Sequence, residues 1–457
     1  MAPVEWNTSN AAHLLRRAGF AGSDVEIADL VKRGLEGSVD YLLNYELIDN
    51  SALEKFLAET IRFDVEDPRS FNRNEIRRFF LLRMAYTRRP LEEKLTLFWH
   101  DHFATAFSKV AEYPMYIQNL TLRRFALARF DELLLNISRD PAMILWLDNN
   151  TNVRGNPNEN FGRELMELFT CGVTDVVTGE PNYTEDDVKE GARAFTGWTV
   201  KRGEFFFNEN QHDFGVKTFR GASGNFNGED IIANLTQDRA TARFIAHKLF
   251  EYFVYPDPNT AIIERFADVY FANDHSIKAL LRALFLSDEF YSNKARFALV
   301  KSPVEFAVGA IRQLKATGAL RNVADTIALQ GQDILNPPDV SGWTSGLGWI
   351  NTSSMLERYN FANDMLINRN REIAVMIDPK LLLPPADKQN KADLVDHFLN
   401  LMGPLEVSSK TRKELQKYLT LDDSGQKGKF KLDDATIDKK VRGLLHLIMS
   451  LPEYHLN

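Results

Sequence analysis

The chain contains 457 residues, enough for one large domain or for roughly two or three domains of ordinary size. Hydrophobic residues make up 44% and aromatic residues 11% of it, so it can form a sizeable core and does not belong to the disordered acidic chains. The 63 acidic and 55 basic residues give a net charge of -8 and are interspersed, which argues against nucleic-acid binding as the main function.

The cysteine content, the hydropathy and the N-terminal residues limit the possible classes of protein further. Cys171 is the only cysteine, which excludes internal disulfides and any cysteine-cluster zinc or iron–sulfur site. A buried thiol is favoured over a nucleophilic one there. No apolar run approaches the roughly 20 residues needed to span a membrane. Residues 1–6 have neither the charged region nor the apolar region of a signal peptide, so no signal peptide is visible. The chain as written would be cytoplasmic, and the sequence leaves the compartment open.

Helical patterning dominates the sequence. Apolar spacing and capping residues predict helices at 11–17, 25–46, 51–61, 72–88, 91–107, 114–136, 160–170 and 185–195, and again between 228 and 320. Thr184 is the expected N-cap of the helix that ends near Phe195, because acidic residues fill the turn that follows it.

Residues 198–228 interrupt this pattern with short aromatic or β-branched runs that are broken by Gly and Asn, which predicts a small β-hairpin insertion. Residues 331–351 form a loop rich in Pro, Gly and Trp, of a length that is usually functional or packed by its own side chains. We therefore expect a mainly α fold with a single large multi-helix unit, residues 1–375, that includes the insertion around 198–228. A C-terminal helical extension, residues 376–457, is expected to pack on it.

The first motif that could carry a catalytic or metal-binding role is the segment 99–103, which contains His100 and His102. Two residues of one helix that are two positions apart point in directions about 200° apart, so they can bind one ion together only at a helix end or in extended chain. His102 shares the apolar stripe of Leu95 and Phe98 and should face the core. A packed, hydrogen-bonded histidine is one interpretation, and an acid–base group or half of a metal site is the other.

The window 148–159 places oxygen-bearing side chains at several positions that an EF-hand loop uses. However, Val153 occupies the position that requires glycine, and Arg154 adds opposing charge, so calcium is a weak interpretation. The same residues are also favoured simply in turns and at helix starts. The calcium candidates are Asp148, Asn150, Asn152 and Glu159.

The segment 158–169 is the most informative stretch, because the apolar stripe of Phe161, Leu165 and Leu168 adjoins a polar one. Glu164 and Glu167 should therefore lie at the edge of the core, where a carboxylate is costly to desolvate unless it is paired. They could take a catalytic or metal role, or Arg163 could pair with one of them in a structural cluster. The polar stripe also contains Asn160.

The insertion and the tryptophans supply the remaining candidates. His212, Asp213 and Lys217 lie within six residues of a loop and suit proton transfer or anion recognition, although such triplets are common. Trp198 and Trp343 lie in glycine-bearing segments where a cleft could form, whereas core packing is the default for tryptophan.

Several established signatures are absent from the sequence. It has no dinucleotide-binding glycine motif, P-loop, serine-hydrolase elbow, His-Glu-x-x-His helix or haem c attachment motif, and no Glu-x-x-His pairs of di-iron bundles. The cofactor is therefore left open. A divalent metal held by residues from the set His100, His102, Glu164 and Glu167 is compatible with the sequence.

Taken together, these segments resemble the bacterial family catalogued as domain of unknown function 1800. The resemblance rests on residues 12–20, 98–105, 158–169 with Gly172, 192–198, 212–213 with Lys217, 242–249 and 331–349. It implies a single, mainly helical family unit and no established reaction. Many relatives look exported and are encoded beside a sulfatase-like family, which the resemblance implies as a partner protein.

The favoured hypothesis is a hydrolase or lyase that acts on a carbohydrate-like polar substrate, in a cleft between the helical body and the insertion. Glu164 or Glu167 would act as base or nucleophile, and a histidine as proton donor or metal ligand. Neighbours three apart on one helix do not readily flank a glycosidic bond, which favours a metal site over a two-Glu glycosidase. The catalytic candidates are Glu164, Glu167, His100, His102, His212 and Asp213, and the substrate-binding candidates are Arg163, Lys217, Asn160, Trp198 and Trp343.

The alternative hypothesis is a non-catalytic scaffold that binds a partner protein. The polar motif residues would then form a buried network that fixes helix packing, and the 331–351 loop would be the contact surface.

Overall fold

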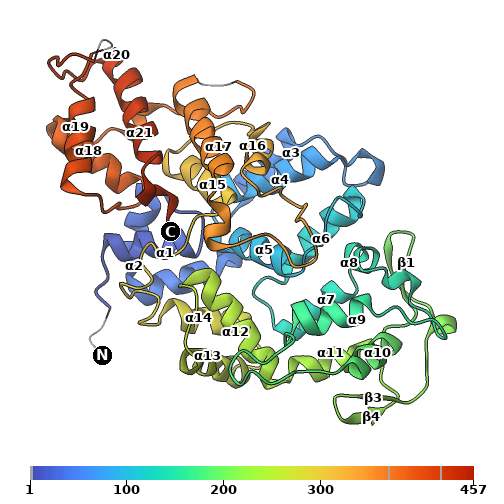
Figure 1. Cartoon of the computed structure of the whole chain (residues 1–457). Helices are drawn as coiled ribbons and strands as arrows, with labels where there is room; N and C mark the ends of the chain where they lie inside the picture. Colours follow the sequence, from blue (N-terminus) through green and yellow to red (C-terminus); the bar gives the residue numbers. More distant parts are fainter. Residues whose placement is uncertain (1–3, 369–370, 423–424) are drawn as a thin grey trace.

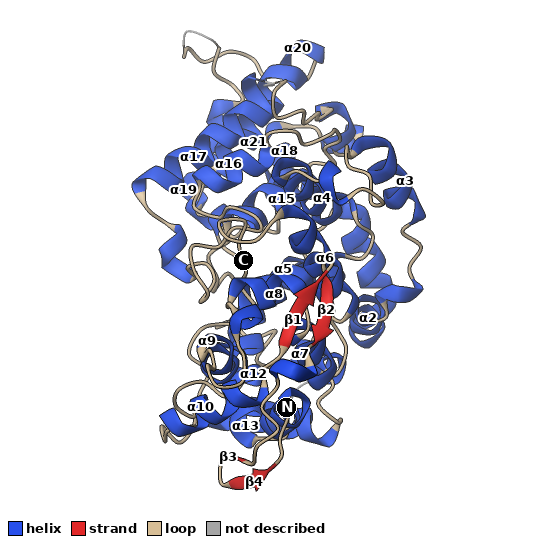
Figure 2. Cartoon of the chain, turned by 90° about the vertical axis from the view of Figure 1, so that its right-hand side faces the viewer, coloured by secondary structure: helices blue, strands red, loops and turns tan. Residues whose placement is uncertain are grey.

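Helices make up most of the computed structural model, which describes residues 4–368, 371–422 and 425–457 (Figures 1 and 2). The helices of the first half are α1 (Thr8–Arg17), α2 (Asp24–Leu43), α3 (Ser51–Thr60), α4 (Arg73–Tyr86), α5 (Pro90–His102), α6 (Glu112–Arg124), α7 (Phe130–Ser138), α8 (Pro141–Trp146), α9 (Asn160–Glu164) and α10 (Glu185–Ala194). Those of the second half are α11 (Gly228–Thr236), α12 (Arg239–Phe253), α13 (Thr260–Ala272), α14 (Ile277–Phe285), α15 (Pro303–Gln313), α16 (Val323–Leu329), α17 (Thr352–Asn363), α18 (Lys391–Leu401), α19 (Ser409–Tyr418), α20 (Asp434–Thr436) and α21 (Arg442–Met449).

Short helical turns connect these elements. The 3-10 turns are η1 (Tyr45–Leu47), η2 (Pro68–Ser70), η3 (Asn149–Thr151), η5 (Glu209–Gln211), η6 (Gly346–Trp349), η8 (Pro379–Leu382), η9 (Ala386–Lys388) and η11 (Pro452–His455), and the π turns are η4 (Leu165–Phe169), η7 (Asp364–Asn368) and η10 (Ile437–Val441).

The strands form two small antiparallel hairpins. β1 (Trp198–Lys201) pairs with β2 (Glu204–Phe207), and β3 (Lys217–Phe219) pairs with β4 (Ala222–Gly224). All four strands lie within residues 198–228, and both views place β3 and β4 at the end of the molecule remote from the C-terminal helices (Figures 1 and 2). The predicted mainly α fold with a small β insertion is confirmed.

Helix α5 runs between two hydrophobic clusters and contributes to both. Leu91, Leu95 and Trp99 belong to the cluster built with α1, α2, α7 and α11–α14. Leu97 belongs to the cluster built with α4, α15–α18 and α21. Every residue of α5 is buried except Asp101. A helix enclosed on all sides must satisfy its polar side chains internally, which makes those of α5 informative.

Several predicted helix boundaries are corrected. The helix expected at 114–136 is two helices, because Arg129 leaves the helical conformation, bridges to Ser276 and starts α7. The helix expected at 91–107 ends at His102. The helix expected at 25–46 is kinked at Gly34, whose φ of 74° only glycine adopts readily. The predicted cap at Thr184 is confirmed, with Asp187 completing a capping box.

The C-terminal residues share a core with the middle of the chain. The second hydrophobic cluster joins Phe80 of α4 and Phe306 of α15 to Phe398 of α18 and Leu445 of α21. The expected division near residue 376 therefore falls within one hydrophobic cluster, and the division into two parts stays a prediction.

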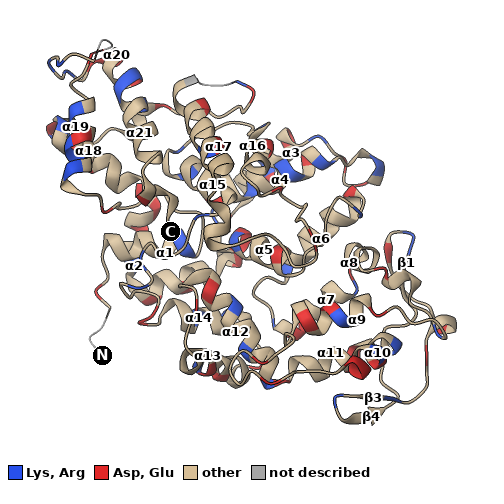
Figure 3. Ribbon diagram, in the orientation of Figure 1, with Lys and Arg blue, Asp and Glu red and all other residues tan. Residues whose placement is uncertain are grey.

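Charged residues of both signs are intermingled along the ribbon (Figure 3). This agrees with the interspersed charges of the sequence and favours a solvated surface over one polyanion-binding face. Within the described ranges, no helix is both long and apolar enough to cross a lipid bilayer.

Candidate functional site

Four segments meet around a small cavity at the C-terminal end of α5. The cavity has a volume of about 50 Å³. It is lined by Phe98, Asp101, His102, Leu168, Lys248, Val340 and Ser341. These residues come from α5, the π turn η4, helix α12 and the 331–351 loop, and each segment carries part of the family resemblance. A space of this size accommodates water or a single substituent, not a whole sugar.

Among the residues that line this cavity, Asp101 is the one best suited to acid–base chemistry. Its Oδ1 accepts a hydrogen bond from the backbone N–H of Trp343 at 2.7 Å. Burial raises the pKa of Asp101 to about 6, although the Trp343 N–H and the charge of Lys248 act in the opposite direction. A carboxyl group with such a pKa exchanges a proton near neutral pH, which is what general acid–base catalysis requires.

The loop approaches Asp101 so closely that Gly342 is required. Its φ is 88°, and a Cβ on it would lie 2.4 Å from Oδ1 of Asp101. Any other residue would have to adopt a disfavoured backbone conformation and also displace the carboxylate. The glycine therefore lets the loop close over the end of α5 and hold the Asp101 carboxylate in place.

His102 is buried beside Asp101 and held by the π turn. Its Nε2 lies 3.1 Å from the carbonyl oxygen of Phe169 and must be the donor in this bond. Burial, with the charge of Lys248, lowers the pKa of His102 to about 3. The imidazole is therefore neutral at ordinary pH, which suits a positioning or hydrogen-bonding role better than that of a proton donor.

The helix expected at 160–170 is corrected to a short α-helix, α9, that continues as the π turn η4. In a π turn the backbone bonds span five residues, and the Thr170 hydroxyl adds a bond of 2.7 Å to the Leu165 carbonyl. The wider turn changes which side chains share a face, so the stripe deduced from regular α-helical spacing does not hold beyond Glu164. Such turns are frequent at functional sites.

Glu164 and Glu167 are half-buried at this turn, as the sequence indicated. Burial, reinforced by the charge of Glu167, raises the pKa of Glu164. The Tyr183 hydroxyl donates to Oε2 of Glu167 at 3.3 Å. Leu168, the residue after Glu167, lines the cavity. The two glutamates therefore sit on the segment that forms one wall of the cavity without lining it themselves.

Arg163 does not pair with either of those glutamates, which corrects the sequence-based expectation. Its guanidinium binds Glu185 at 2.8 Å and Glu159 at 3.3 Å. These pairs join α9 to the start of α10 on a partly exposed surface. Asn160 is exposed, and its backbone N–H donates to the side chain of Asn158.

His100 does not line the cavity. It is fully buried, neither ring nitrogen has a hydrogen-bond partner in the described part of the chain, and burial lowers its pKa to about 3. Its ring lies edge-on to Trp343 with the centroids 5.4 Å apart. Trp343 is itself 8% exposed, so it packs over α5 and does not present a cleft surface.

The three candidates of the insertion form a closed network of their own. His212 Nδ1 lies 2.8 Å from the Thr196 carbonyl, and Asp213 pairs with Arg193 at 2.8 Å. Lys217 is completely buried and donates to the carbonyl oxygens of Asp213, at 2.6 Å, and of Gly215, at 3.1 Å. These contacts are those of a structural network that shapes the insertion.

Trp198 packs as a core residue. It is 1% exposed, and its ring contacts Phe195 and Phe205 at centroid distances of 5.1 Å. This burial agrees with the core packing that is the default for tryptophan, and the cleft role of Trp198 stays a prediction.

The two carboxylates among the calcium candidates form ion pairs with basic side chains. Asp148 pairs with Lys109 at 2.7 Å, and Glu159 pairs with Arg163. The Asn152 side chain donates to Asn149 and Ala192 and accepts from the Asn158 N–H, while Asn150 is exposed. Across the described residues, no group of three or more His, Cys, Asp or Glu side chains is placed to hold a metal ion.

A polar recess of about 850 Å³ lies where the insertion meets the helical body, at the place where a cleft was expected. Its lining includes Tyr183, whose hydroxyl binds Glu167, and Arg220 of the β3–β4 turn. Asn234 and Gln237 of the α11 region are exposed in it. Amides, carboxylates and an aromatic ring are groups that suit a hydroxyl-rich ligand.

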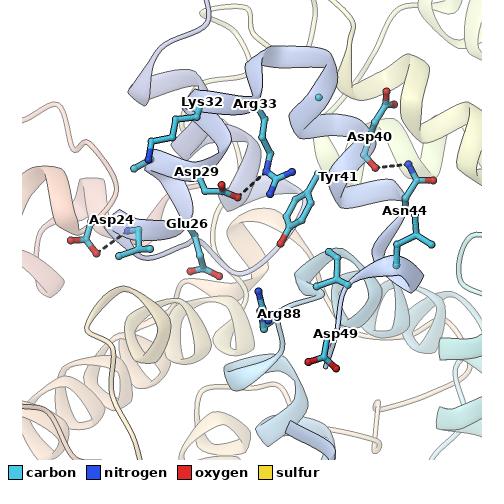
Figure 4. Close-up of a pocket in the computed structure, with 15 residues that line it drawn as sticks. Asp24, Glu26, Asp29, Lys32, Arg33, Asp40, Tyr41, Asn44, Asp49 and Arg88 are labelled. Atoms are coloured by element: carbon cyan, nitrogen blue, oxygen red, sulfur yellow. Dashed lines mark hydrogen bonds and ion pairs between the residues drawn. The ribbon is translucent and has the colours of Figure 1, made fainter. Parts of the chain in front are cut away.

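A second large recess, of about 1090 Å³, lies along the kinked helix α2 and contains none of the predicted site residues (Figure 4). Arg33 packs over the Tyr41 ring at 4.0 Å and pairs with Asp29 at 2.8 Å. Its charged groups are mostly exposed surface residues, and its size alone gives it no chemistry. We therefore place the candidate site at the smaller cavity.

The comparison with protein families agrees with the geometry. The model of the family described as "Protein of unknown function (DUF1800)" matches residues 13–456. The chain belongs to this family. No curated protein and no solved structure matches the chain significantly. The match includes all four segments that meet at the cavity, so the site of this DUF1800 protein is built from parts of the family domain.

Sequence reasoning missed three residues of the cavity, namely Asp101, Lys248 and Ser341. Asp101 lies between His100 and His102, and its sequence signal is a charged residue within an otherwise aromatic and apolar helix end. Lys248 and Ser341 lie far away in sequence, and only the packing of α12 and the loop against α5 brings them to Asp101.

Proposed function

We propose that this DUF1800 protein is a hydrolase or lyase that acts on a polar, carbohydrate-like substrate, with Asp101 as its principal acid–base group. The observation that carries the proposal is the Asp101 carboxyl, with its raised pKa, in a cavity beside Lys248 and the neutral His102. Perturbed carboxyls in a recess are typical of catalytic sites.

The roles of the residues follow from their positions. Protonated Asp101 would donate to a leaving oxygen, and ionised Asp101 would accept a proton from water or from a carbon acid. Lys248 would orient an anionic or strongly polar group, and His102, fixed by the Phe169 carbonyl, would hold water or a substrate hydroxyl. The polar recess beside Tyr183 supports the carbohydrate-like class, because its groups match a ring of hydroxyls.

A matched pair of variants tests the proposal. In both Asp101→Asn and Asp140→Asn an amide replaces a carboxyl whose pKa is raised by burial. Only Asp101 lines the cavity, whereas Asp140 caps α8 and binds Gln118 at 3.1 Å. The purified protein is screened on neutral, uronic and sulfated glycans for new reducing ends and for the absorbance of a new double bond.

We expect Asp101→Asn to lower the rate of any activity found by roughly 10²–10⁴-fold and Asp140→Asn to leave it within severalfold. Where Asp101 acts as an acid, the activity falls as the pH rises through about 6. Equal activity of Asp101→Asn and wild type, or the absence of activity and of glycan binding throughout the panel, would contradict the proposal.

One observation favours the non-catalytic alternative for part of the chain. The polar groups of Asp213, Lys217 and Arg163 are all paired within the protein, as in a structural network. A scaffold function predicts that Asp213→Asn lowers the melting temperature, and that the purified sulfatase-like partner binds this chain in titration calorimetry. If Asp213→Asn keeps catalytic activity and Asp101→Asn loses it, the enzyme hypothesis is favoured over the scaffold hypothesis.

A further inference from the structure

The polar recess beside Tyr183 is formed by three segments of the chain. They are residues 181–187 before and at the start of α10, residues 220–221 of the β3–β4 turn, and residues 234–238 at the end of α11. Its volume of about 850 Å³ falls within the range that is typical of ligand pockets, whereas the Asp101 cavity has about 50 Å³. The recess, and not the cavity, is therefore large enough to hold a sugar ring.

The two carboxylates that line the recess are held by donors of the protein itself. Asp187 accepts hydrogen bonds from the Thr184 N–H at 2.8 Å and from the Arg220 N–H at 2.6 Å. Asp238 accepts one from the Ala240 N–H at 3.1 Å and pairs with the Arg220 guanidinium. Both oxygens of each carboxylate therefore have a partner, and neither group depends on a ligand for a hydrogen bond.

The charges that line the recess do not cancel. Asp187 and Asp238 are matched by Arg220 alone, which leaves one negative charge in excess. Glu167, which accepts a hydrogen bond from the Tyr183 hydroxyl, adds a further carboxylate next to the lining. An anionic ligand would therefore be repelled, and for one pair of charges about 4 Å apart in water this repulsion amounts to roughly fivefold in affinity.

The free polar side chains of the recess are neutral amides. Asn234 of α11 and Gln237, the C-cap of that helix, are three positions apart and lie on the same face. Both are exposed, and neither side chain has a hydrogen-bond partner in the described part of the chain. A carboxamide both donates and accepts hydrogen bonds, as a hydroxyl group does, whereas a sulfate or carboxylate group only accepts them. The two amides therefore match hydroxyl groups.

We propose that the polar recess binds an uncharged, hydroxyl-bearing part of the substrate through Asn234 and Gln237 and discriminates against uronic and sulfated sugars. The inference rests on the proposed carbohydrate-like substrate, but it concerns binding and not the chemistry at Asp101. The π turn η4 connects the two places, because Glu167 binds Tyr183 of the recess and Leu168 lines the cavity. A charged substituent of the substrate is therefore expected in the cavity and not in the recess.

The test measures binding by titration calorimetry. The protein is the full chain with Asp101→Asn, which slows turnover and leaves the recess intact. The neutral probes are tetrasaccharides of glucose, galactose and mannose, and the anionic probe is tetragalacturonic acid, the charged counterpart of the galactose tetramer.

The variant combines Asn234→Ala and Gln237→Ala. Both positions are exposed and alanine is the best helix former, so the variant should keep the fold, which its melting temperature verifies. The control is Asn225→Ala, which removes an exposed amide of the insertion that does not line the recess.

We expect at least one neutral tetrasaccharide to bind, and the double variant to bind it about tenfold more weakly, because it loses two hydrogen bonds. Asn225→Ala should leave the affinity unchanged. Tetragalacturonic acid should bind at least about fivefold more weakly than the galactose tetramer at low ionic strength, and added salt should narrow this difference.

Three results would overturn the inference: tighter binding of tetragalacturonic acid than of the neutral probes, an unchanged affinity in the double variant, or no binding of any neutral probe. Failure of the proposed activity gives a different result. Neutral probes that bind but are not turned over by the wild type would contradict the activity alone. Turnover and affinity that the double variant leaves unchanged would contradict the role of the recess alone.

Discussion

Replacement of His100 by leucine should stabilise the protein, and much more at acidic than at alkaline pH. The native pKa is lowered by burial from 6.5 to about 3, so the unfolded chain binds the proton more readily between these values. Stability contributed by the neutral ring is therefore lost as the pH falls below 6.5. At pH 5 this lowers the free energy of unfolding of the wild type by about 2 kcal/mol, because pH 5 lies 1.5 units below 6.5 and each unit is worth about 1.4 kcal/mol. At pH 8 this loss vanishes.

A smaller contribution to the change in the free energy of unfolding does not depend on pH. The unpartnered ring nitrogens cost roughly 1–3 kcal/mol, and leucine removes that cost while losing the edge contact with Trp343, worth about 0.5–1.5 kcal/mol. The net change at pH 8 is therefore modest, so the comparison of the two pH values carries the prediction.

The assay is urea denaturation of wild type and His100→Leu at pH 5 and pH 8. Other titrating groups cancel, because each comparison is made at one pH. His247→Leu, on the partly exposed side of α12, serves as the control and should change the free energy of unfolding by no more than about 0.5 kcal/mol. If the stabilisation by His100→Leu is the same at both pH values, the buried neutral histidine is not what the structure indicates.

Two further predictions test packing around the site. Glu93→Gln should lower the free energy of unfolding by about 3–5 kcal/mol in denaturant melts, since it leaves Arg123 buried without a counter-charge and Arg83 with only the half-exposed Glu54. Glu54→Gln, at the half-exposed end of the network, should cost no more than about 1 kcal/mol. Gly172→Ala should cost at least about 1–2 kcal/mol in thermal melts, because φ is 78° and the new Cβ would lie 3.1 Å from the Phe244 ring; Gly179→Ala, with φ of 74° and open space, isolates the backbone part of that cost.

Local patterns predicted the helices that depend on local chemistry. The cap at Thr184 and the acidic first turn of α10 specify that helix within a few residues of the chain. The break between α6 and α7 could not be predicted in this way, because Arg129 bridges to Ser276, far away in sequence. Helix existence follows from short-range spacing, whereas several boundaries follow from tertiary contacts.

The π turn shows the same limit at the site itself. Residues 160–170 have the apolar spacing of a regular helix, and their sequence does not predict a π turn. The turn is completed by bonds from Thr170 and Gly172 back to Leu165 and Met166. Glu164 and Glu167 were located correctly at the edge of the core, but their partners were not, since Tyr183 and Glu185 enter through the packing of α10.

From the sequence alone, the ionisable candidates at positions 100, 102, 164, 167, 212 and 213 predict one active site. The structure separates them by environment: Asp101, His102 and Lys248 meet at a cavity, Asp213 and Lys217 are paired inside the insertion, and His100 is buried in the core. A charge in the core constrains the fold as strongly as a charge in a site, because each demands a partner. Ionisable character alone therefore does not mark catalysis. The distinguishing property is an ionisable group that lines a cavity: Glu92 of α5 also has a raised pKa, of about 7, but of these two carboxyls only Asp101 lines the small cavity.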